Sequence, residues 1–223
     1  LVATVLSLIG VIVHLYRSKH FLRIRRDELH YLKIDPAILR SLVAKGLPMG
    51  LQMIVMSTSM IVLIALVNSF GAHTTAAYGA CFQLWNYIQM PSIAVGMAAS
   101  SMAAQNVGAG RWDRVDKVAL TGLGFNVLLT GCLVLVVYLF NRGALGLFLP
   151  ADGDSIEIAQ HINHIAVWSF ILFGISFVLA GVVRSTGAVI PPLIILVIAL
   201  WVVRIPFAYT FVHAWGADAI WWS

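Results

Sequence analysis

The sequence predicts an all-α protein, a polytopic membrane helix bundle that crosses a bilayer several times. Of the 223 residues, 61% are hydrophobic and only 10% are charged, whereas a soluble domain carries about 25% charged residues. The mean hydropathy is +0.93. Apolar runs of about 20 residues or more, long enough to span a bilayer as helices, recur between short polar segments.

The chain has a net charge of +5 and a pI near 9.5. Basic residues of a membrane protein gather in its cytoplasmic loops, so we read this excess as a sign of membrane orientation and expect no nucleic-acid partner. Cys81 and Cys132 both lie in apolar runs. A cysteine in that setting is a small packing residue and implies no disulfide framework.

The first 45 residues precede the main run of spans. Residues 1–16 read as the end of a transmembrane helix, and we expect the chain to be a fragment that is cut at both ends. Residues 17–45 carry eight Lys and Arg, which predicts a basic amphipathic linker on the cytoplasmic face, in contact with membrane lipid. Within this linker, Asp35 and Pro36 predict an N-cap and the first residue of a helix. The remaining spans lie in 46–223.

The second span is expected over about 46–70. Gln52, Met56 and Ser59 follow one another at i, i+4 and i+7, so they share one face of this helix. Two polar side chains and a flexible methionine on one face favour the lining of a substrate cavity.

The third span is expected over about 76–108, and its first thirty or so residues carry no charge. Pro91 interrupts it near the middle and predicts a bend. Gln83, Asn86 and Met90 fall on or near one face. We expect them to line the substrate cavity together with the three residues of the second span. The alternative is that such polar residues make hydrogen bonds between packed helices.

Three further spans are expected, over about 117–140, 158–183 and 188–213. The base-rich segments 17–45 and 108–117 alternate with the base-poor segments 71–75 and 141–157. This alternation predicts that the base-rich segments are cytoplasmic and that the protein lies in the inner (plasma) membrane of the cell.

Arg204 is the one charge well inside a predicted span. An arginine at the middle of a bilayer costs roughly 2.5–3.5 kcal/mol on insertion scales. Pro206 should leave the carbonyl of Val202 without its usual donor. We expect the guanidinium to bond nearby carbonyls or to reach outward, and a role in gating or ion coupling is the alternative.

Asp154, Glu157, His161 and His164 recur along one predicted helix, and such side chains can bind a metal. Acids are ordinary at a helix N-terminus and histidines at a membrane interface, so we expect no metal site. The sequence contains no phosphate-binding loop, metalloprotease motif or nucleophile elbow, and no paired catalytic groups at membrane depth. An enzyme is therefore not expected.

Several short segments resemble, in order and spacing, the C-terminal lobe of the multidrug and toxic compound extrusion (MATE) transporters. The similarity covers about 180 residues. The matching segments are 46–50, 65–71, 77–79, 90–91, 105–111, Arg184 with Gly187, and 204–206.

The resemblance implies twelve helices in two six-helix lobes around a central cavity. This chain would hold the end of helix six, the linker, and a C-terminal lobe that lacks its last helix, with the N-terminal lobe of the same full-length chain as partner. The implied activity is export of small organic, often cationic, molecules in exchange for protons or sodium ions, with no other cofactor. The positions expected to have structural or gating roles are Pro91, Arg184, Gly187, Arg204 and Pro206.

The chain departs from the family where some branches carry acids. Met56 stands where a carboxylate is found in helix seven, and 170–180 contains no acid. Cation-driven antiport needs an ionisable group within the membrane, so we expect the coupling carboxylate in the missing N-terminal lobe. The alternatives are a related flippase for lipid-linked oligosaccharide or peptidoglycan precursor and, from a different class, an intramembrane enzyme.

Overall fold

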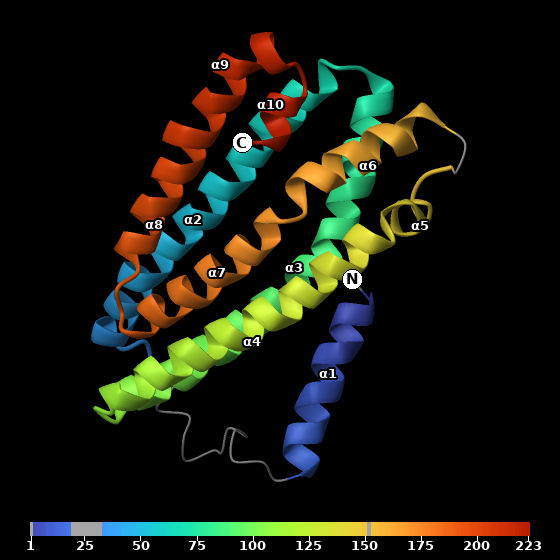
Figure 1. Ribbon diagram of the computed structural model, residues 1–223. Helices are drawn as coiled ribbons and strands as arrows, with labels where there is room; N and C mark the ends of the chain where they lie inside the picture. The colour runs from blue at the N-terminus through green and yellow to red at the C-terminus, as the bar shows by residue number, and fades with distance from the viewer. Residues whose placement is uncertain (1, 19–32, 151–152) are drawn as a thin grey trace. The chain divides into compact units, whose positions relative to one another are not determined.

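The computed structural model describes residues 2–18, 33–150 and 153–223, and its regular elements are all helical, as predicted (Figure 1). The chain divides into two compact units, residues 1–44 and 45–223. Each unit is described by itself.

The first unit contains α1, Val2–Arg17, and the beginning of α2, Pro36–Asn68. The Asp35 carboxylate accepts hydrogen bonds from the backbone N–H groups of Ala37 and Ile38, at 2.8 and 3.3 Å. The predicted N-cap and the start of the helix at Pro36 are therefore confirmed. Residues 19–32, which make up about half of the predicted basic linker 17–45, lie outside the described residues.

The second unit contains the rest of α2 and a series of helices that follow it. These are α3 (Ala72–Gly108), α4 (Trp112–Leu139), α5 (Asn141–Leu145), α6 (Asp154–Ala166), α7 (Ser169–Ser185), α8 (Ile190–Val197), a π-helical segment (Ile198–Arg204), α9 (Ile205–Trp215) and α10 (Asp218–Trp221). Pro191 and Pro192 lie in the first turn of α8, as the sequence predicts.

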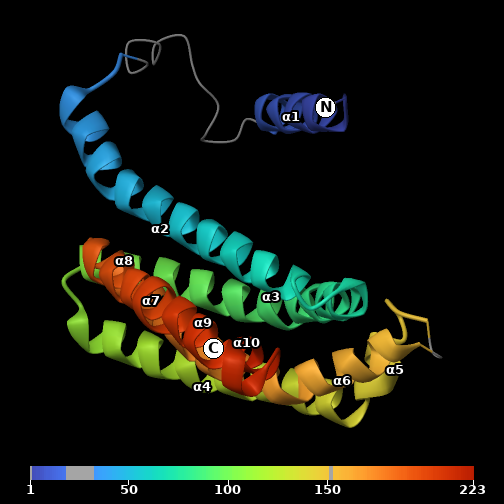
Figure 2. The same cartoon turned by 90° about the horizontal axis from the view of Figure 1, so that it is seen from above.

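The centre of this unit is α3, which packs against α4, α6 and α7 (Figures 1 and 2). Glycines allow the close approach. A Cβ atom added to Gly181 of α7 would lie 3.0 Å from the carbonyl oxygen of Gly96 in α3, and one added to Gly96 would lie 2.5 Å from the Phe177 ring. Because small residues let helix backbones approach closely, α3, α4 and α7 form a tight three-helix core.

The membrane-crossing potential of the helices differs in part from the prediction. Among the described residues, α2, α4 and the continuous rod Ile190–Trp215 are long and apolar enough to cross a membrane. The third predicted span does not meet this criterion, although α3 has 37 residues. The reason is its content of polar and small residues, which lowers its mean hydropathy.

The segment predicted as a single straight span over 158–183 is bent, because α6 and α7 meet at an angle of 49°; together the two helices are long and apolar enough to cross a membrane as one broken span. At the break, the N–H groups of Phe170 and Ile171 donate to the carbonyls three residues earlier, Val167 and Trp168. The Ser169 hydroxyl donates to the Ala166 carbonyl at 2.7 Å. These shorter-range bonds replace the regular helical ladder and allow the bend.

The last span contains an irregularity just before Pro206. Residues Ile198–Arg204 form a π helix, and the N–H of Ile205 donates to the carbonyl of Leu200, five residues earlier. A proline cannot continue the usual ladder, and the wider π spacing lets the chain pass it without ending the helix.

Candidate functional site

The predicted polar residues of α3 lie on its uncovered side. Gln83 is exposed, and Met90 is 64% exposed. The Asn86 amide donates to the carbonyl of Phe82 in its own helix, at 3.0 Å. We call Gln83, Asn86 and Met90 the α3 polar face. No hydrogen bond joins this face to another helix among the described residues, so its polarity does not serve packing within this part of the chain.

The three predicted residues of α2 lie in three different environments. The Gln52 side chain donates to the Val189 carbonyl, just before α8, at 3.2 Å. Met56 is 44% exposed, whereas Ser59 is 1% exposed. The structure therefore does not bring all six predicted residues onto one open surface. Met56 resembles the α3 polar face in its exposure, and Ser59 does not.

The opposite side of α3 is fixed by a buried chain of amides that the sequence analysis missed. The Trp85 indole N–H donates to the Asn163 side-chain oxygen at 2.9 Å. The Asn163 amide donates to Asn141 at 2.8 Å, and the Asn141 amide donates to the Gln160 carbonyl at 3.1 Å. These contacts join α3 to α5 and α6. They orient α3 so that its polar face points away from the core.

A second buried polar cluster lies beside Pro91 and was also missed. Ser92 and Thr130 share a hydrogen bond of 2.6 Å between their hydroxyls. The Asn126 amide donates to the Ser92 backbone carbonyl at 3.0 Å, and its oxygen accepts from Thr130 at 3.0 Å. Asn126 and Thr130 stand four residues apart in an apolar span, and this spacing was the available signal. The cluster links α3 to α4 at the proline.

The predicted structural residues at the end of α7 form a defined turn. The Arg184 guanidinium lies 5.7 Å from the centroid of the Phe177 ring, as a cation–π pair. Gly187 has φ +89°, a conformation that favours glycine, and its N–H donates to the Arg184 carbonyl at 3.0 Å. Both residues therefore help to end α7 before α8 begins.

Arg204 was expected to bond nearby carbonyls or to reach outward. It is half-buried, and its Nε has no hydrogen-bond partner among the described residues. The Nε therefore makes no bond to a nearby carbonyl, and the outward reach of the guanidinium stays a prediction. The buried Ser59 hydroxyl also lacks a partner.

The histidines and acids of α6 do not gather into a metal site. His161 pairs with Asp218 of α10 at 2.9 Å, and His164 bonds the Tyr138 hydroxyl at 3.2 Å. Within the described ranges, no group of three or more His, Cys, Asp or Glu side chains is placed to hold a metal.

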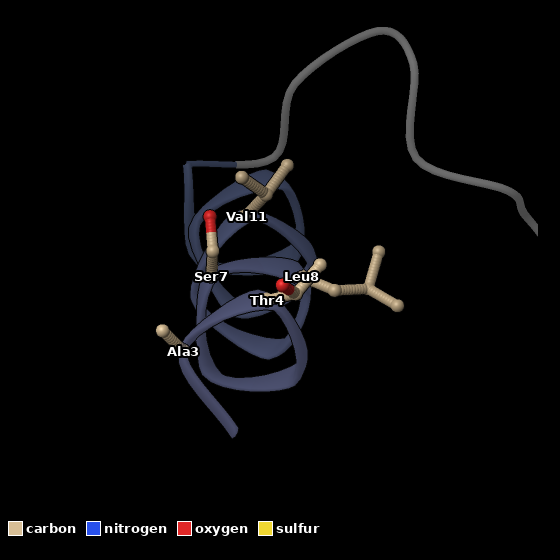
Figure 3. A pocket seen from close by; sticks show the side chains of 5 residues that line it. All are labelled: Ala3, Thr4, Ser7, Leu8 and Val11. Carbon is tan, nitrogen blue, oxygen red and sulfur yellow. The ribbon is translucent and has the colours of Figure 1, made fainter. Parts of the chain in front are cut away.

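Two hollows are present at the surface of the described chain. One, of about 560 Å³, is lined by Phe207, Trp215, Asp218 and Trp222. The other lies on α1, and its five lining side chains all project from that single helix (Figure 3). The hollow on α1 presents the hydroxyls of Thr4 and Ser7 beside apolar side chains, and no charged or aromatic group lines it.

The comparisons with known proteins identify a family of transporters. The family model described as MatE matches residues 48–210. The probable multidrug resistance protein YoeA of Bacillus subtilis (strain 168) is 34% identical over 212 residues, covering 95% of this chain and 46% of YoeA. The probable multidrug resistance protein YpnP of the same organism is 32% identical over 170 residues, covering 76% of this chain and 38% of YpnP. The chain spans less than half the length of these two relatives.

Solved structures of transporters share the fold. A crystal structure of MATE in complex with MaD3S has a TM-score of 0.85 at 18% identity, covering 98% of this chain and 48% of that chain. The outward-facing conformation of a multidrug resistance MATE family transporter of the MOP superfamily has a TM-score of 0.78 at 19% identity, covering 86% and 44%. At this level of identity the likeness concerns the fold alone.

Proposed function

The chain belongs to the MATE family of multidrug efflux transporters, multi-pass membrane proteins that are not enzymes, and we propose that it forms the C-terminal lobe of an antiporter. The whole transporter would export small organic, often cationic, compounds in exchange for protons or sodium ions, across the inner (plasma) membrane. Residues 46–223 would form the lobe itself. Residues 1–16 would end the last helix of the N-terminal lobe, and 17–45 would connect the two lobes along the cytoplasmic lipid surface.

The observation that carries this proposal is the open α3 polar face. Lipid tails offer no hydrogen bonds, so a face with Gln83 and Asn86 is costly if it lies against them. The same face is acceptable against a water-filled cavity or a transported molecule. Amides that donate and accept, beside flexible and polarisable methionines such as Met90, suit a pocket that admits cargoes of different shapes. We therefore assign the substrate surface to this face, with Gln52 and Met56 of α2 at its margin.

The rest of the lobe would act as a rigid body in alternating access. The close packing of α3, α4 and α7 supports this role, since a tightly packed core moves as a unit and deforms little. Pro91 would set the direction of α3. The turn at Arg184 and Gly187, together with the irregular helix at Arg204 and Pro206, would mark the places where the lobe bends.

Ion coupling would depend on a group elsewhere in the full-length protein. The six acids among the described residues lie in loops or near helix ends, and Met56 occupies a place where a carboxylate would be possible. A coupling site near the middle of a membrane requires an ionisable side chain there. The exchanged proton or sodium ion would therefore bind in the N-terminal lobe, while this lobe binds cargo and moves.

The proposal is tested by replacing Gln83 and Asn86 together with alanine in the full-length transporter. The expected result is a changed pattern of drug resistance, because the protein loses two amides that would form hydrogen bonds with the cargo. Membrane expression should stay normal. Asn106→Ala is the matched control, since Asn106 is an amide on another side of the same helix and, like Asn86, donates to the carbonyl four residues earlier, that of Met102, at 2.8 Å. A resistance pattern that is unchanged in the double variant would remove the α3 polar face from the substrate site.

A further inference from the structure

Two buried polar atoms of the described residues lack a hydrogen-bond partner, the Nε of Arg204 and the hydroxyl of Ser59. Burial of such a group removes its bonds to water, and without a replacement this destabilises the fold. Native proteins keep few unpartnered groups of this kind, and each one calls for an explanation. Here two of them belong to predicted functional residues on different helices.

Each of the two groups follows, along its own helix, a residue of one contact between α2 and the π-helical segment. The Trp201 indole N–H donates to the Val55 carbonyl at 3.4 Å. Ser59 follows Val55 by one helical turn, and Arg204 follows Trp201 by three residues. The Val55 carbonyl is the acceptor that a helical serine at position 59 would normally use. It already accepts from Trp201 and from the Thr58 hydroxyl at 3.2 Å, so the Ser59 hydroxyl remains free to donate.

Tyr78 of α3 contacts α2 beside Ser59. Its hydroxyl lies 3.7 Å from the Met60 sulfur, and Met60 follows Ser59 in sequence. Contacts from α3 and from the π-helical segment therefore reach α2 within about one helical turn of Ser59.

The charge of Arg204 is uncompensated. No acidic side chain of the described residues forms a salt bridge with it, although a cation within a membrane span normally faces the protein interior and pairs with another group. A guanidinium presents several N–H donors in a planar fork, which matches the two oxygens of a carboxylate or the oxygens of a phosphate. The local π helix agrees with a binding role, since π-helical turns are frequent at functional sites.

We propose that Arg204 and Ser59 form an intramembrane site for an acidic group of the cargo, a carboxylate or phosphate oxyanion. This inference rests on the proposed transport function and narrows its substrate class. The amides and methionines of the α3 polar face accept a neutral or cationic body of varied shape, and the Arg204 site recognises an acidic substituent. Zwitterionic and anionic organic molecules then belong to the cargo of this transporter.

The test measures binding of two matched dyes to the purified full-length transporter by fluorescence polarisation. One dye is a rhodamine with a free carboxylate, and the other is its methyl ester. We expect Arg204→Gln to lower the affinity for the carboxylate dye by about tenfold or more, as for a lost charged hydrogen bond. The affinity for the ester should stay nearly unchanged. Ser59→Ala should lower the affinity for the carboxylate dye by a smaller factor. Thr58→Ala is its control, because that hydroxyl bonds the Ile54 carbonyl of its own helix at 2.7 Å.

Two further measurements use a conservative variant, which should still fold, and a competition between different anions. Arg204→Lys keeps the charge without the planar fork, and it should retain part of the selectivity for the carboxylate dye. Acetate should displace the carboxylate dye, and an equal concentration of chloride should not, if the site prefers an oxyanion.

The proposal would be overturned if Arg204→Gln lowered the affinities for the two dyes equally and Arg204→Lys lowered them equally as well. That pattern would mean that Arg204 is held by a carboxylate elsewhere in the protein or serves only the fold. No effect of Arg204→Gln on either dye would overturn it as well, and so would displacement of the dye by chloride. In each of these outcomes the response of the ester dye to changes at Gln83 and Asn86 still reports separately on the proposed function.

Discussion

At single residues, the polar side chains of α3 divide between two faces that have different partners. Trp85 and Ser92 are buried and bond to neighbouring helices. Gln83 and Asn86 make no such bonds among the described residues. The hydrogen-bond partners of a polar residue therefore show whether it stabilises the fold or is free to bind cargo. The sequence alone does not distinguish the two kinds of residue.

The packing around Asn126 leads to a prediction at this scale. Gly174→Ala should destabilise the protein by about 1–3 kcal/mol, as overpacking does, because a Cβ at Gly174 would collide with the Asn126 side-chain oxygen. Thermal unfolding of the purified full-length protein measures the effect. Gly124→Ala is the control, since a Cβ there meets no atom within 4 Å. Equal unfolding temperatures for the two variants would contradict the packing described here.

Local rules predict some residues well and others not at all. Asp35, Pro36 and Gly187 act through their own backbone and nearest turns, and the structure agrees with their predicted roles. The partners of Asn126 and Asn163 are distant in sequence. Their contacts depend on how the helices pack, and no spacing rule along one chain specifies that packing.

Among the elements, the contact between α3 and α6 is held by the buried bond from Trp85 to Asn163. Asn163→Leu should cost about 1–3 kcal/mol, because it leaves the indole N–H unsatisfied. Trp85→Phe combined with Asn163→Leu should recover part of that loss, since neither group then lacks a partner. Thermal unfolding of the two single variants and the double variant completes the cycle. Strictly additive losses would show that this bond does not join the helices.

The approximate extent of the spans was predictable from the sequence, but the breaks within them were not. A bend between α6 and α7 interrupts one predicted span, and the π-helical segment interrupts another. Hydropathy averages over many residues and cannot detect a bend that depends on a few backbone bonds. It also fails for α3, whose polar and small residues lower its average although it is the central helix of its unit.

At the scale of the whole molecule, orientation follows from the distribution of basic residues. We predict that the turn at His73 faces outward and that the segment at Arg114 is cytoplasmic. Single cysteines at these exposed positions, in a full-length protein without Cys81 and Cys132, are treated on intact cells with a membrane-impermeant thiol reagent. His73→Cys should react and Arg114→Cys should not. Labelling of Arg114→Cys from outside would reverse the orientation.

The proposed division of labour between the lobes gives a prediction for coupling. Asp154→Asn and Glu157→Gln should leave ion-driven efflux nearly intact, because both acids lie in the first turn of α6 and not in the middle of a span. Drug efflux driven by an imposed proton or sodium gradient in proteoliposomes measures this. Loss of coupled transport in either variant, with normal incorporation, would place ion coupling in this lobe.

The central claim, that the α3 polar face lines the cargo cavity, is tested most directly by thiol accessibility along α3 in the full-length transporter. Cysteines are placed one at a time at Gln83, Asn86 and Met90, with Leu84 as a buried control, in a background that lacks Cys81 and Cys132. The account predicts that a water-soluble reagent modifies the three face positions, that bound drug protects them, and that position 84 stays unmodified. Reaction of the three positions only with a lipid-soluble reagent, without protection by drug, would show that the face meets lipid and would contradict the account.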